Sequence, residues 1–137
     1  VKLLRETPRE ITNTALEEFM RFDAPLHLFE RTATADTEVG GVQIQEGQKI
    51  AALIGSANRD ETVFSAPETM DLTRDPNPHI GFGAGIHFCL GAPLARLEMS
   101  VSLPALWEKY PTMQLASVPV RRPTFVLRGY ESVAISV

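Results

Sequence analysis

The sequence predicts an α+β fold, and three features of the chain lead to this prediction. Near the start, apolar residues recur at helical spacing, at Ile11, Ala15, Phe19 and Phe22. Between residues 26 and 54, short β-branched and apolar segments alternate with glycine turns, which is typical of strands. A second helical pattern follows a glycine-rich loop, and short strand-like segments continue from there to the end of the chain.

The first helix carries signals at both of its ends. Thr7 and Glu10 have the spacing of a capping box, and Pro8 stands at the first helical position. Pro25 ends the helix, because a proline disfavours the α conformation in the residue before it. We therefore expect a helix that begins at Thr7 and ends shortly before Pro25.

The segment after Pro25 predicts a small amount of β-structure. Gly40-Gly41 marks a tight hairpin, and Glu46-Gly47 marks a second turn. Residues 33–37 are rich in threonine and lead into the hairpin, so they are assigned to strand and turn rather than to a helix. The expected elements are strands at 26–33, 37–39, 42–44 and 49–54, and an irregular proline-containing meander at 65–78.

The second helix is expected to run from residue 92 to about Tyr110. Its apolar face is expected to point inward, and that face consists of Leu94, Leu97, Val101 and either Leu106 or Trp107. The remaining segments are expected to form strands at 113–115, 118–120, 124–127 and 133–137, with a turn at Arg128-Gly129 between the last two.

Composition narrows the range of functions. The chain has 137 residues, 44% hydrophobic and 22% charged, which is ordinary for a globular protein. Its net charge of −4 disfavours a nucleic acid as partner, because a nucleic-acid binder needs a basic stripe. A single cysteine excludes an internal disulfide, so a reducing, cytoplasmic location is the default expectation.

That cysteine, Cys89, lies in the most distinctive stretch of the chain. Glycines surround it at positions 81, 83, 85 and 91, and glycine is used where the backbone takes positive φ or approaches another group closely. Backbone N–H groups in such a loop, together with the start of the following helix, would stabilise a thiolate over a thiol. The local chemistry indicates a protected, electron-rich thiolate that can bind a metal.

Three other kinds of site are weaker interpretations. Zinc usually needs three or four ligands, and the only nitrogen and sulfur candidates are Cys89, His27, His79 and His87, without a paired cysteine motif. A cysteine hydrolase would need an exposed Cys89 beside a histidine base. A dinucleotide site is excluded, because Ile86 stands where the glycine pattern requires its last glycine.

The same stretch resembles the haem-binding loop of the cytochrome P450 family, the haem-thiolate monooxygenases. The matching motif reads Phe82-Gly83-x-Gly85-x-His87-x-Cys89-x-Gly91. The continuation over residues 92–98 resembles the soluble, bacterial-type branch, and residues 57–60 resemble the start of a short helix in that branch. The resemblance implies haem b (iron protoporphyrin IX) with Cys89 as its axial ligand. It implies insertion of an oxygen atom into an apolar small molecule, with electrons from a ferredoxin or flavin reductase.

The resemblance also assigns roles around the haem. His87 and Arg31 match the family's partners of the haem propionates, and such contacts are charge-assisted. Further contacts to the macrocycle or the cysteine loop would come from Ile80, Phe82, Gly83, Gly91 and Ala95. Candidate substrate contacts are Leu26, His27, Phe29, Val126 and Leu127. For His27, a substrate contact and a solvent-facing position are both open.

Glu18 and Arg21 are neighbours on one face of the first predicted helix. Alone, this spacing indicates an ordinary surface ion pair, worth about 0–1 kcal/mol. It also resembles the family's buried Glu-x-x-Arg pair, which a third arginine joins, and Arg74 in the meander matches that arginine. The triad implied by the resemblance would fix the meander beneath the cysteine loop and take no part in the chemistry.

The resemblance extends along nearly the whole chain but only onto the C-terminal part of the family fold. Val1 is not an initiator methionine, so we expect residues 1–137 to be the haem-binding portion of one larger domain. The N-terminal helical part would then be supplied by the same or a separate chain. Residues 33–37 nearly match the family's oxygen-activating motif, but Thr34 replaces its glycine and the segment follows the Glu-x-x-Arg helix. A non-catalytic haem-binding or assembly module is the alternative function.

Overall fold

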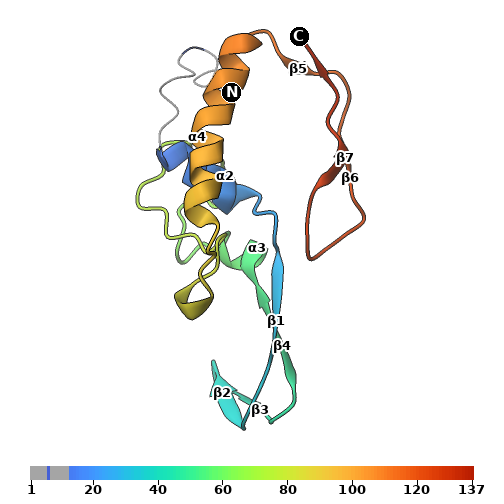
Figure 1. Ribbon diagram of the computed structural model, residues 1–137. Coiled ribbons are helices and arrows are strands. Elements are labelled where there is room, and N and C mark those ends of the chain that lie inside the picture. Colours follow the sequence, from blue (N-terminus) through green and yellow to red (C-terminus); the bar gives the residue numbers. More distant parts are fainter. Residues whose placement is uncertain (1–5, 7–12) are drawn as a thin grey trace.

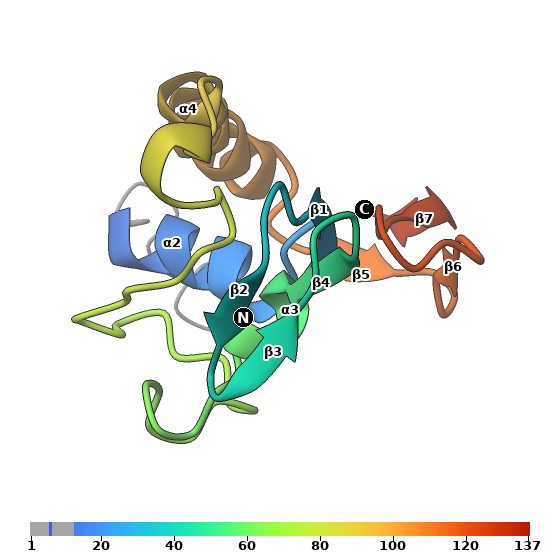
Figure 2. The ribbon, with the colours of Figure 1, turned by 90° about the horizontal axis from the view of Figure 1, so that it is seen from below.

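The structure is a computed structural model that describes Glu6 and residues 13–137 (Figure 1). The predicted helix cap at Thr7, Pro8 and Glu10 lies outside the described residues, as does Ile11. Two helices, α2 (Asn13–Phe22) and α4 (Ala92–Lys109), lie against each other. The β1–β4 ribbon extends away from them at one end, and the C-terminal strands form a separate arm (Figures 1 and 2).

Helix α2 ends where the sequence predicts, because Pro25 follows it closely. Ala15 and Leu16 are the buried apolar residues of this helix. Glu18 and Arg21, two residues with charged side chains, are also buried. A charged pair inside a protein needs a full set of partners, so this side of α2 already indicates a structural site.

Strand β1 (Leu28–Thr32) pairs antiparallel with β4 (Lys49–Leu53), and Leu28 lies opposite Leu53. Strands β2 (Thr37–Val39) and β3 (Val42–Ile44) form the predicted hairpin. Gly40 and Gly41 have φ angles of 58° and 80° at its turn, which glycine adopts without strain. Residues 33–36 form a bend before β2, so the assignment of 33–37 to strand and turn is confirmed.

The short helix expected to begin at 57–60 is misplaced. Helix α3 (Ile54–Ala57) follows β4 directly and ends at residue 57, where the helix was expected to start. The Asn58 N–H donates to the Ile54 carbonyl at 3.0 Å, and the Asn58 side chain is fully buried. Its Oδ1 accepts the Ile80 N–H at 2.9 Å, so Asn58 joins the end of α3 to the residues that precede the cysteine loop. The expected irregular meander at 65–78 is confirmed.

After the meander, a short 3₁₀ helix η2 (Gly85–His87) and then α4 follow. Helix α4 has nearly the predicted bounds and contains Pro104. The prediction that its apolar face points inward is wrong for these residues: Leu94, Leu97 and Val101 are 59%, 60% and 64% exposed. Helix α2 packs on another side of α4, and within Glu6 and residues 13–137 nothing covers this face.

The C-terminal arm consists of two strand pairs, β5 (Gln114–Leu115) with β8 (Ile135–Ser136) and β6 (Val120–Arg121) with β7 (Tyr130–Ser132). The strand expected at 124–127 is wrong, because these residues form the loop between β6 and β7. The segment after Pro25 takes their hydrogen bonds instead: the His27 N–H donates to the Val126 carbonyl at 2.9 Å, and Leu127 pairs with Leu26. The turn expected at Arg128-Gly129 lies inside that loop. The Arg122 N–H donates to the Gly129 carbonyl and so joins the two ends of the loop.

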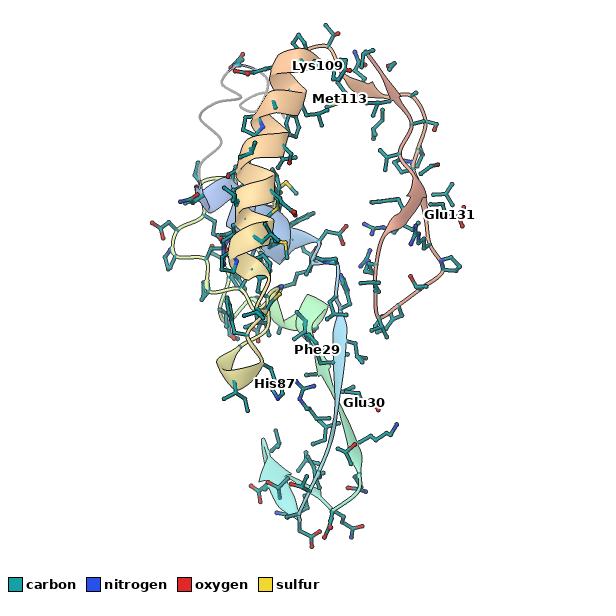
Figure 3. All side chains as sticks on the ribbon, in the orientation of Figure 1. Phe29, Glu30, His87, Lys109, Met113 and Glu131 are labelled. Carbon is teal, nitrogen blue, oxygen red and sulfur yellow. The ribbon has the colours of Figure 1, made fainter. Side chains whose placement is uncertain are left out.

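The buried core is small and lies around α2. Its apolar members are Ala15, Leu16, Ala24, Ile54, Phe64, Phe82 and Ala92. Side chains of the C-terminal arm and of the β2–β3 hairpin stand away from the helices (Figure 3). Among the described residues, no helix has the length and apolar character needed to cross a bilayer.

Candidate functional site

Cys89 lies at the end of the glycine-rich loop, immediately before α4. It is a free, exposed cysteine. Its N–H donates to the Phe82 carbonyl at 2.8 Å, and its own carbonyl accepts the Ala92 N–H at 3.1 Å. The backbone on both sides of the cysteine is therefore fixed while the sulfur stays accessible, as a ligand to a large cofactor requires.

The glycines of this loop have different physical roles. Gly83 and Gly85 have φ angles of 76° and 60°, which residues with a side chain rarely adopt. Gly81 is needed for space instead, because a Cβ atom there would lie 2.7 Å from the Met20 carbonyl oxygen. Gly91 caps α4 with an ordinary φ of −81°. The loop thus turns twice within three residues and packs directly against α2.

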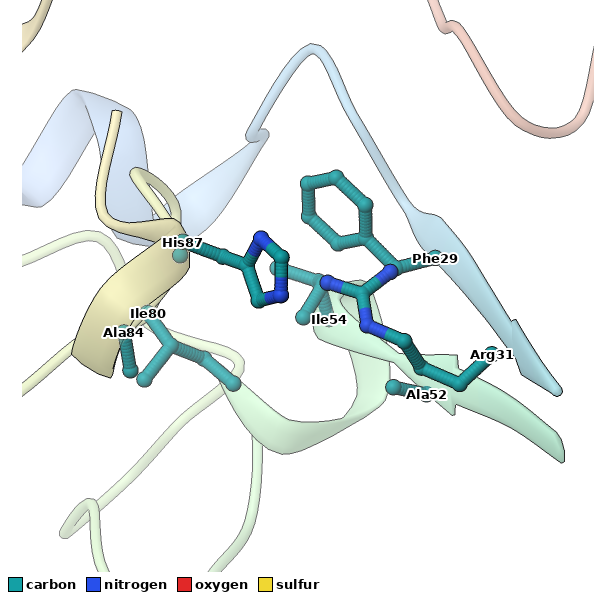
Figure 4. Close-up of a pocket in the computed structure, with 8 residues that line it drawn as sticks. Phe29, Arg31, Ala52, Ile54, Ile80, Ala84 and His87 are labelled. Carbon is teal, nitrogen blue, oxygen red and sulfur yellow. The ribbon is translucent and has the colours of Figure 1, made fainter. Parts of the chain in front are cut away.

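A pocket of about 140 Å³ opens beside this loop. Its walls come from β1, β4, α3, the end of the meander and the cysteine loop. Figure 4 shows the Arg31 guanidinium and the His87 ring pointing toward each other across it. The lining residues are Phe29, Arg31, Ala52, Ile54, Ile80, Gly83, Ala84 and His87. Apolar walls with two nitrogen donors at one edge suit an apolar molecule that carries anionic groups.

Arg31 reaches the pocket from β1. One of its guanidinium nitrogens donates to the Glu30 carbonyl at 2.9 Å, and the group lies 5.6 Å from the centre of the Phe29 ring. His87 approaches from the opposite side, at the end of η2. Within residues 13–137 the Glu30 carbonyl accepts one hydrogen bond from the exposed Arg31, whose guanidinium has five N–H donors in all.

The structure brings five of the predicted cofactor and substrate residues to this pocket: Phe29, Arg31, Ile80, Gly83 and His87. Phe82 is buried behind the loop, with its ring 6.4 Å from that of Phe88. Cys89, Gly91 and Ala95 do not line the pocket; Cys89 and Gly91 precede α4, and Ala95 lies in its first turn. The sequence missed Ala52, Ile54 and Ala84, whose place in the lining depends on strand pairing and loop geometry.

The other substrate candidates lie elsewhere. Leu26, Val126 and Leu127 meet where the β6–β7 loop contacts the segment after Pro25. The His27 ring lies against Gly55, where a Cβ atom would be 2.4 Å from Nδ1. Burial, with help from nearby Arg128, holds the pKa of His27 below its usual range. The structure therefore places His27 in a packed position and not in open solvent.

Glu18, Arg21 and Arg74 come together in a buried cluster. Arg21 donates to both Glu18 oxygens at 2.7 Å, and Arg74 Nε donates to Glu18 Oε2 at 3.1 Å. The Asp71 N–H and the Asn77 side-chain amide also donate hydrogen bonds to the Glu18 carboxylate, at 2.8 and 3.1 Å. The interpretation of Glu18 and Arg21 as a surface ion pair is wrong, because both side chains are fully buried.

The arginines of this cluster also bind the meander directly. Arg21 donates to the carbonyls of Asn58, Pro67 and Thr69, at 2.8 to 3.2 Å. Burial alone would raise the pKa of Glu18, but the hydrogen bonds from Arg21 and Asp71 outweigh it and hold the pKa below its ordinary value. The cluster therefore stays ionised and connects α2 with the irregular segment that leads to the cysteine loop.

A second cluster next to the first was not found in the sequence. Glu17 accepts hydrogen bonds from Arg96 Nε and Nη2 at 2.5 and 2.8 Å, and from His79 Nε2 at 2.8 Å. The fork from Arg96 is the first cause that lowers the pKa of Glu17. Only the adjacency of Glu17 to Glu18 could have signalled it, because its partners are distant in the sequence.

Comparison with known proteins gives the same fold. The sequence model of the family described as cytochrome P450 matches residues 7–126. The chain is 40% identical over 97% of its length to the biotin biosynthesis cytochrome P450 of Bacillus subtilis, and 48% identical over 88% to the nocardicin C N-oxygenase of Nocardia uniformis. It spans about a third of these relatives, 34% and 31% of their lengths.

Solved structures of cytochromes P450 also match the fold of this chain. The crystal structure of P450BioI in complex with an acyl carrier protein ligated to hexadec-9Z-enoic acid has a TM-score of 0.92 and 40% identity, over 97% of this chain and 35% of that one. CYP109B1 from Bacillus subtilis has a TM-score of 0.90 and 45% identity, over 99% of this chain and 37% of that one. The structure thus has the α+β architecture of the C-terminal region of bacterial cytochromes P450. The chain belongs to the cytochrome P450 family.

Proposed function

We propose that residues 1–137 form the haem-ligating part of a cytochrome P450 monooxygenase, with Cys89 as the axial ligand. One observation carries the proposal. In a chain of this family, Cys89 is the single cysteine, and its backbone is held by Phe82 and Ala92 while its sulfur is exposed. The glycine-rich loop has the geometry that keeps one thiolate in place before the start of a helix.

The donor set of the pocket suits haem b. Arg31 and His87 converge at one edge and would bind the two propionates, while Phe29, Ile54 and Ile80 supply apolar walls for the macrocycle. When bound, haem supplies the chemistry by which one oxygen atom is inserted into a substrate. The chain's own contributions are the electron-rich thiolate of Cys89 and the orientation of the cofactor.

The proposed substrate is an apolar small molecule. Leu26, Val126 and Leu127 cluster at the contact of the β6–β7 loop with the segment after Pro25, and Val126 and Leu127 are exposed. Phe29 lines the cofactor pocket, and the His27 backbone N–H is hydrogen-bonded to the Val126 carbonyl of this cluster. These five residues are the proposed substrate contacts of the chain.

The remaining parts of the proposal concern partners and location. Electrons would come from a ferredoxin or a flavin reductase, since the thiolate and the cofactor need an external donor. The net charge of −4 disfavours nucleic acid, and the single cysteine is compatible with a cytoplasmic location.

We further propose that these residues function as part of a larger domain. Leu94, Leu97 and Val101 of α4, with Leu90 just before the helix, form an apolar stripe with 4-3-4 spacing, and these side chains are 59–99% exposed. The relatives are about three times as long as this chain. The N-terminal part of the same fold, in the same or a separate chain, would cover this stripe.

The same exposed stripe favours the second candidate function, a non-catalytic haem-binding or assembly module. The deciding experiment uses the complete protein, by which we mean the full polypeptide that carries residues 1–137, with its haem. Hydrogen peroxide replaces oxygen and electrons, and the probes are testosterone and hexadec-9Z-enoic acid, which occur in structures of relatives. Oxygenated product that is lost in Cys89→Ser supports the monooxygenase. Full haem content without product from either probe supports the assembly module.

A further inference from the structure

The second carboxylate of α2, Glu17, connects residues on both sides of the cysteine loop. We define the Glu17 clamp as Glu17, His79 and Arg96. We propose that the Glu17 clamp positions the Cys89 loop, by holding the backbone on both sides of the cysteine to a single carboxylate. This inference rests on the proposed role of Cys89 as the haem ligand, and Glu17 acts through other residues without touching the sulfur.

The first arm of the clamp fixes the entry to the loop. The Gly81 N–H donates to His79 Nδ1 at 3.0 Å, so Nδ1 is the acceptor of the ring and Nε2 carries the hydrogen. Nε2 then donates to Glu17 Oε2 at 2.8 Å. The His79 side chain is only 3% exposed, so this relay from the carboxylate to the loop backbone is shielded from water.

The second arm fixes the exit from the loop. Arg96 lies in the second turn of α4 and forms a bidentate contact with the Glu17 carboxylate. A guanidinium–carboxylate fork sets direction as well as distance, which a single hydrogen bond does not. The start of α4 is therefore oriented relative to α2, and Cys89 lies three residues before α4 begins.

The two arms meet at Phe82. The Arg96 guanidinium lies 4.6 Å from the centre of the Phe82 ring, and the His79 ring centre lies 6.1 Å from it. Phe82 is buried, and its carbonyl accepts the Cys89 N–H at 2.8 Å. A change at Glu17 thus reaches the cysteine through Arg96 and Phe82, and also through His79 and Gly81.

The two neighbouring carboxylates of α2 have different partners. Glu18 and its arginines hold the meander, whereas the side-chain hydrogen bonds of Glu17 within residues 13–137 go to His79 and Arg96, on either side of the cysteine loop. Loss of Glu18 should weaken the whole fold. Loss of Glu17 should loosen the loop selectively, because its side chain is 23% exposed and its removal leaves the core packing intact.

The test is backbone amide hydrogen exchange in the complete protein, measured with haem and after haem removal. In Glu17→Gln, exchange at Cys89 and Gly81 should accelerate about tenfold relative to the parent, the equivalent of one charge-assisted hydrogen bond. Arg96→Lys keeps the charge but loses the fork, so it should act in the same direction. In a double-mutant cycle with Arg96→Gln, the effects should be non-additive, since both changes break one contact.

Two control variants separate positioning from general loss of stability. Leu16→Ala removes a fully buried side chain next to Glu17 on α2, so it should raise exchange throughout the fold. Glu61→Gln changes an exposed carboxylate and should leave exchange unchanged. If Glu17→Gln raised exchange evenly across the protein, as Leu16→Ala should, or left Cys89 and Gly81 unaffected, the positioning role would be overturned.

A spectroscopic reading keeps this inference distinct from the assignment of the ligand. In the reduced, carbon-monoxide-bound protein, Glu17→Gln should increase the fraction with a thiol-type spectrum, while Leu16→Ala should not. Retention of the thiolate-type spectrum in Cys89→Ser would overturn the proposed function itself. Loss of that spectrum in Cys89→Ser, with unchanged exchange at Cys89 in Glu17→Gln, would overturn only the role of the Glu17 clamp.

Discussion

Replacement of Glu18 by glutamine should destabilise the fold more than any surface ion-pair change. The Glu18 carboxylate is fully buried and accepts five hydrogen bonds, two from Arg21 and one each from Arg74, Asp71 and Asn77. An amide turns one of its two acceptor atoms into a donor that faces arginine donors. The variant keeps the shape of the side chain, so the loss is electrostatic rather than a cavity.

The size of the effect follows from the position of Arg21. Breaking a buried ion pair costs about 3–5 kcal/mol, because the remaining charge stays buried without its partner. Arg21 keeps its bonds to the carbonyls of Asn58, Pro67 and Thr69, so the expected cost is at the lower end, about 3 kcal/mol. Arg74→Ala removes the hydrogen bond to the Glu18 carboxylate and those to the carbonyls of Ser65, Ala66 and Thr69. The loss of the charge-assisted bond alone should cost about 1.5–3 kcal/mol.

The assay is urea denaturation of the complete protein, with the free energy of unfolding extrapolated to water. The matched control is Glu30→Gln, which breaks the exposed Glu30–Lys49 pair and should leave the unfolding midpoint unchanged. If Glu18→Gln lay within about 0.5 kcal/mol of the parent, the buried cluster would contribute no more than a surface pair, and the reasoning from its burial would be refuted.

The same cluster sets a pH dependence. The folded pKa of Glu18 lies below its unfolded value, so its contribution to stability is complete above the ordinary carboxyl range and is lost as the pH falls through the folded pKa. Glu17 has a lowered pKa, chiefly through Arg96, and acts with the same sign. The free energy of unfolding of the parent should therefore fall with acidification below that range, and Glu18→Gln should show a shallower slope.

Three further predictions concern the cofactor site and the extent of the fold. Arg31→Ala and His87→Ala should each weaken haem binding by roughly tenfold or more, since each removes a charge-assisted contact; haem-transfer titration measures this, and unchanged affinity in both would place the propionates elsewhere. Gly81→Ala should destabilise the loop, because its Cβ atom would lie 2.7 Å from the Met20 carbonyl oxygen; thermal unfolding at the parent temperature would contradict this. Residues 1–137 expressed alone should associate, bind haem weakly and form no product; a monodisperse, haem-replete, active monomer would contradict the need for the rest of the domain.

Local signals in the sequence were enough to predict most elements of this fold. Pro25 ends α2, Gly40-Gly41 forms the β2–β3 turn, and the pattern after Cys89 gives α4 nearly its full length. Each of these depends on the conformational preferences of a few adjacent residues, so the sequence contains the information directly.

The errors in the fold concern residues whose conformation depends on distant partners. Residues 124–127 have strand-like composition, but the Val126 carbonyl accepts the His27 N–H, and the Arg128 N–H donates to the Pro25 carbonyl. Helix α3 was placed too late in the chain. Asn58 lies at its end and binds the distant Ile80 N–H, a contact that local sequence signals do not reveal. The prediction that Leu94, Leu97 and Val101 of α4 point inward failed because the spacing of apolar residues does not say whether the same chain covers them.

The candidate site shows the same division. The ten-residue motif around Cys89 led to the cysteine loop. The spacing of Glu18 and Arg21 alone indicated a surface ion pair, and only the resemblance to the family's triad, with Arg74, led to the buried cluster. Glu17 was missed because its partners, His79 and Arg96, lie 62 and 79 residues away in sequence. His27 was left between substrate and solvent, whereas its packing against Gly55 is determined by the position of α3.

The most direct test of the central claim is one absorption spectrum. The complete protein is reduced, saturated with carbon monoxide and compared with its Cys89→Ser variant, with haem content measured in both. The parent should show the thiolate-type spectrum, because Cys89 is the single cysteine of residues 1–137 and its loop holds the sulfur before α4. The variant should lose that spectrum even where it retains haem. A thiolate-type spectrum that persists in Cys89→Ser would contradict the assignment of Cys89 as the ligand.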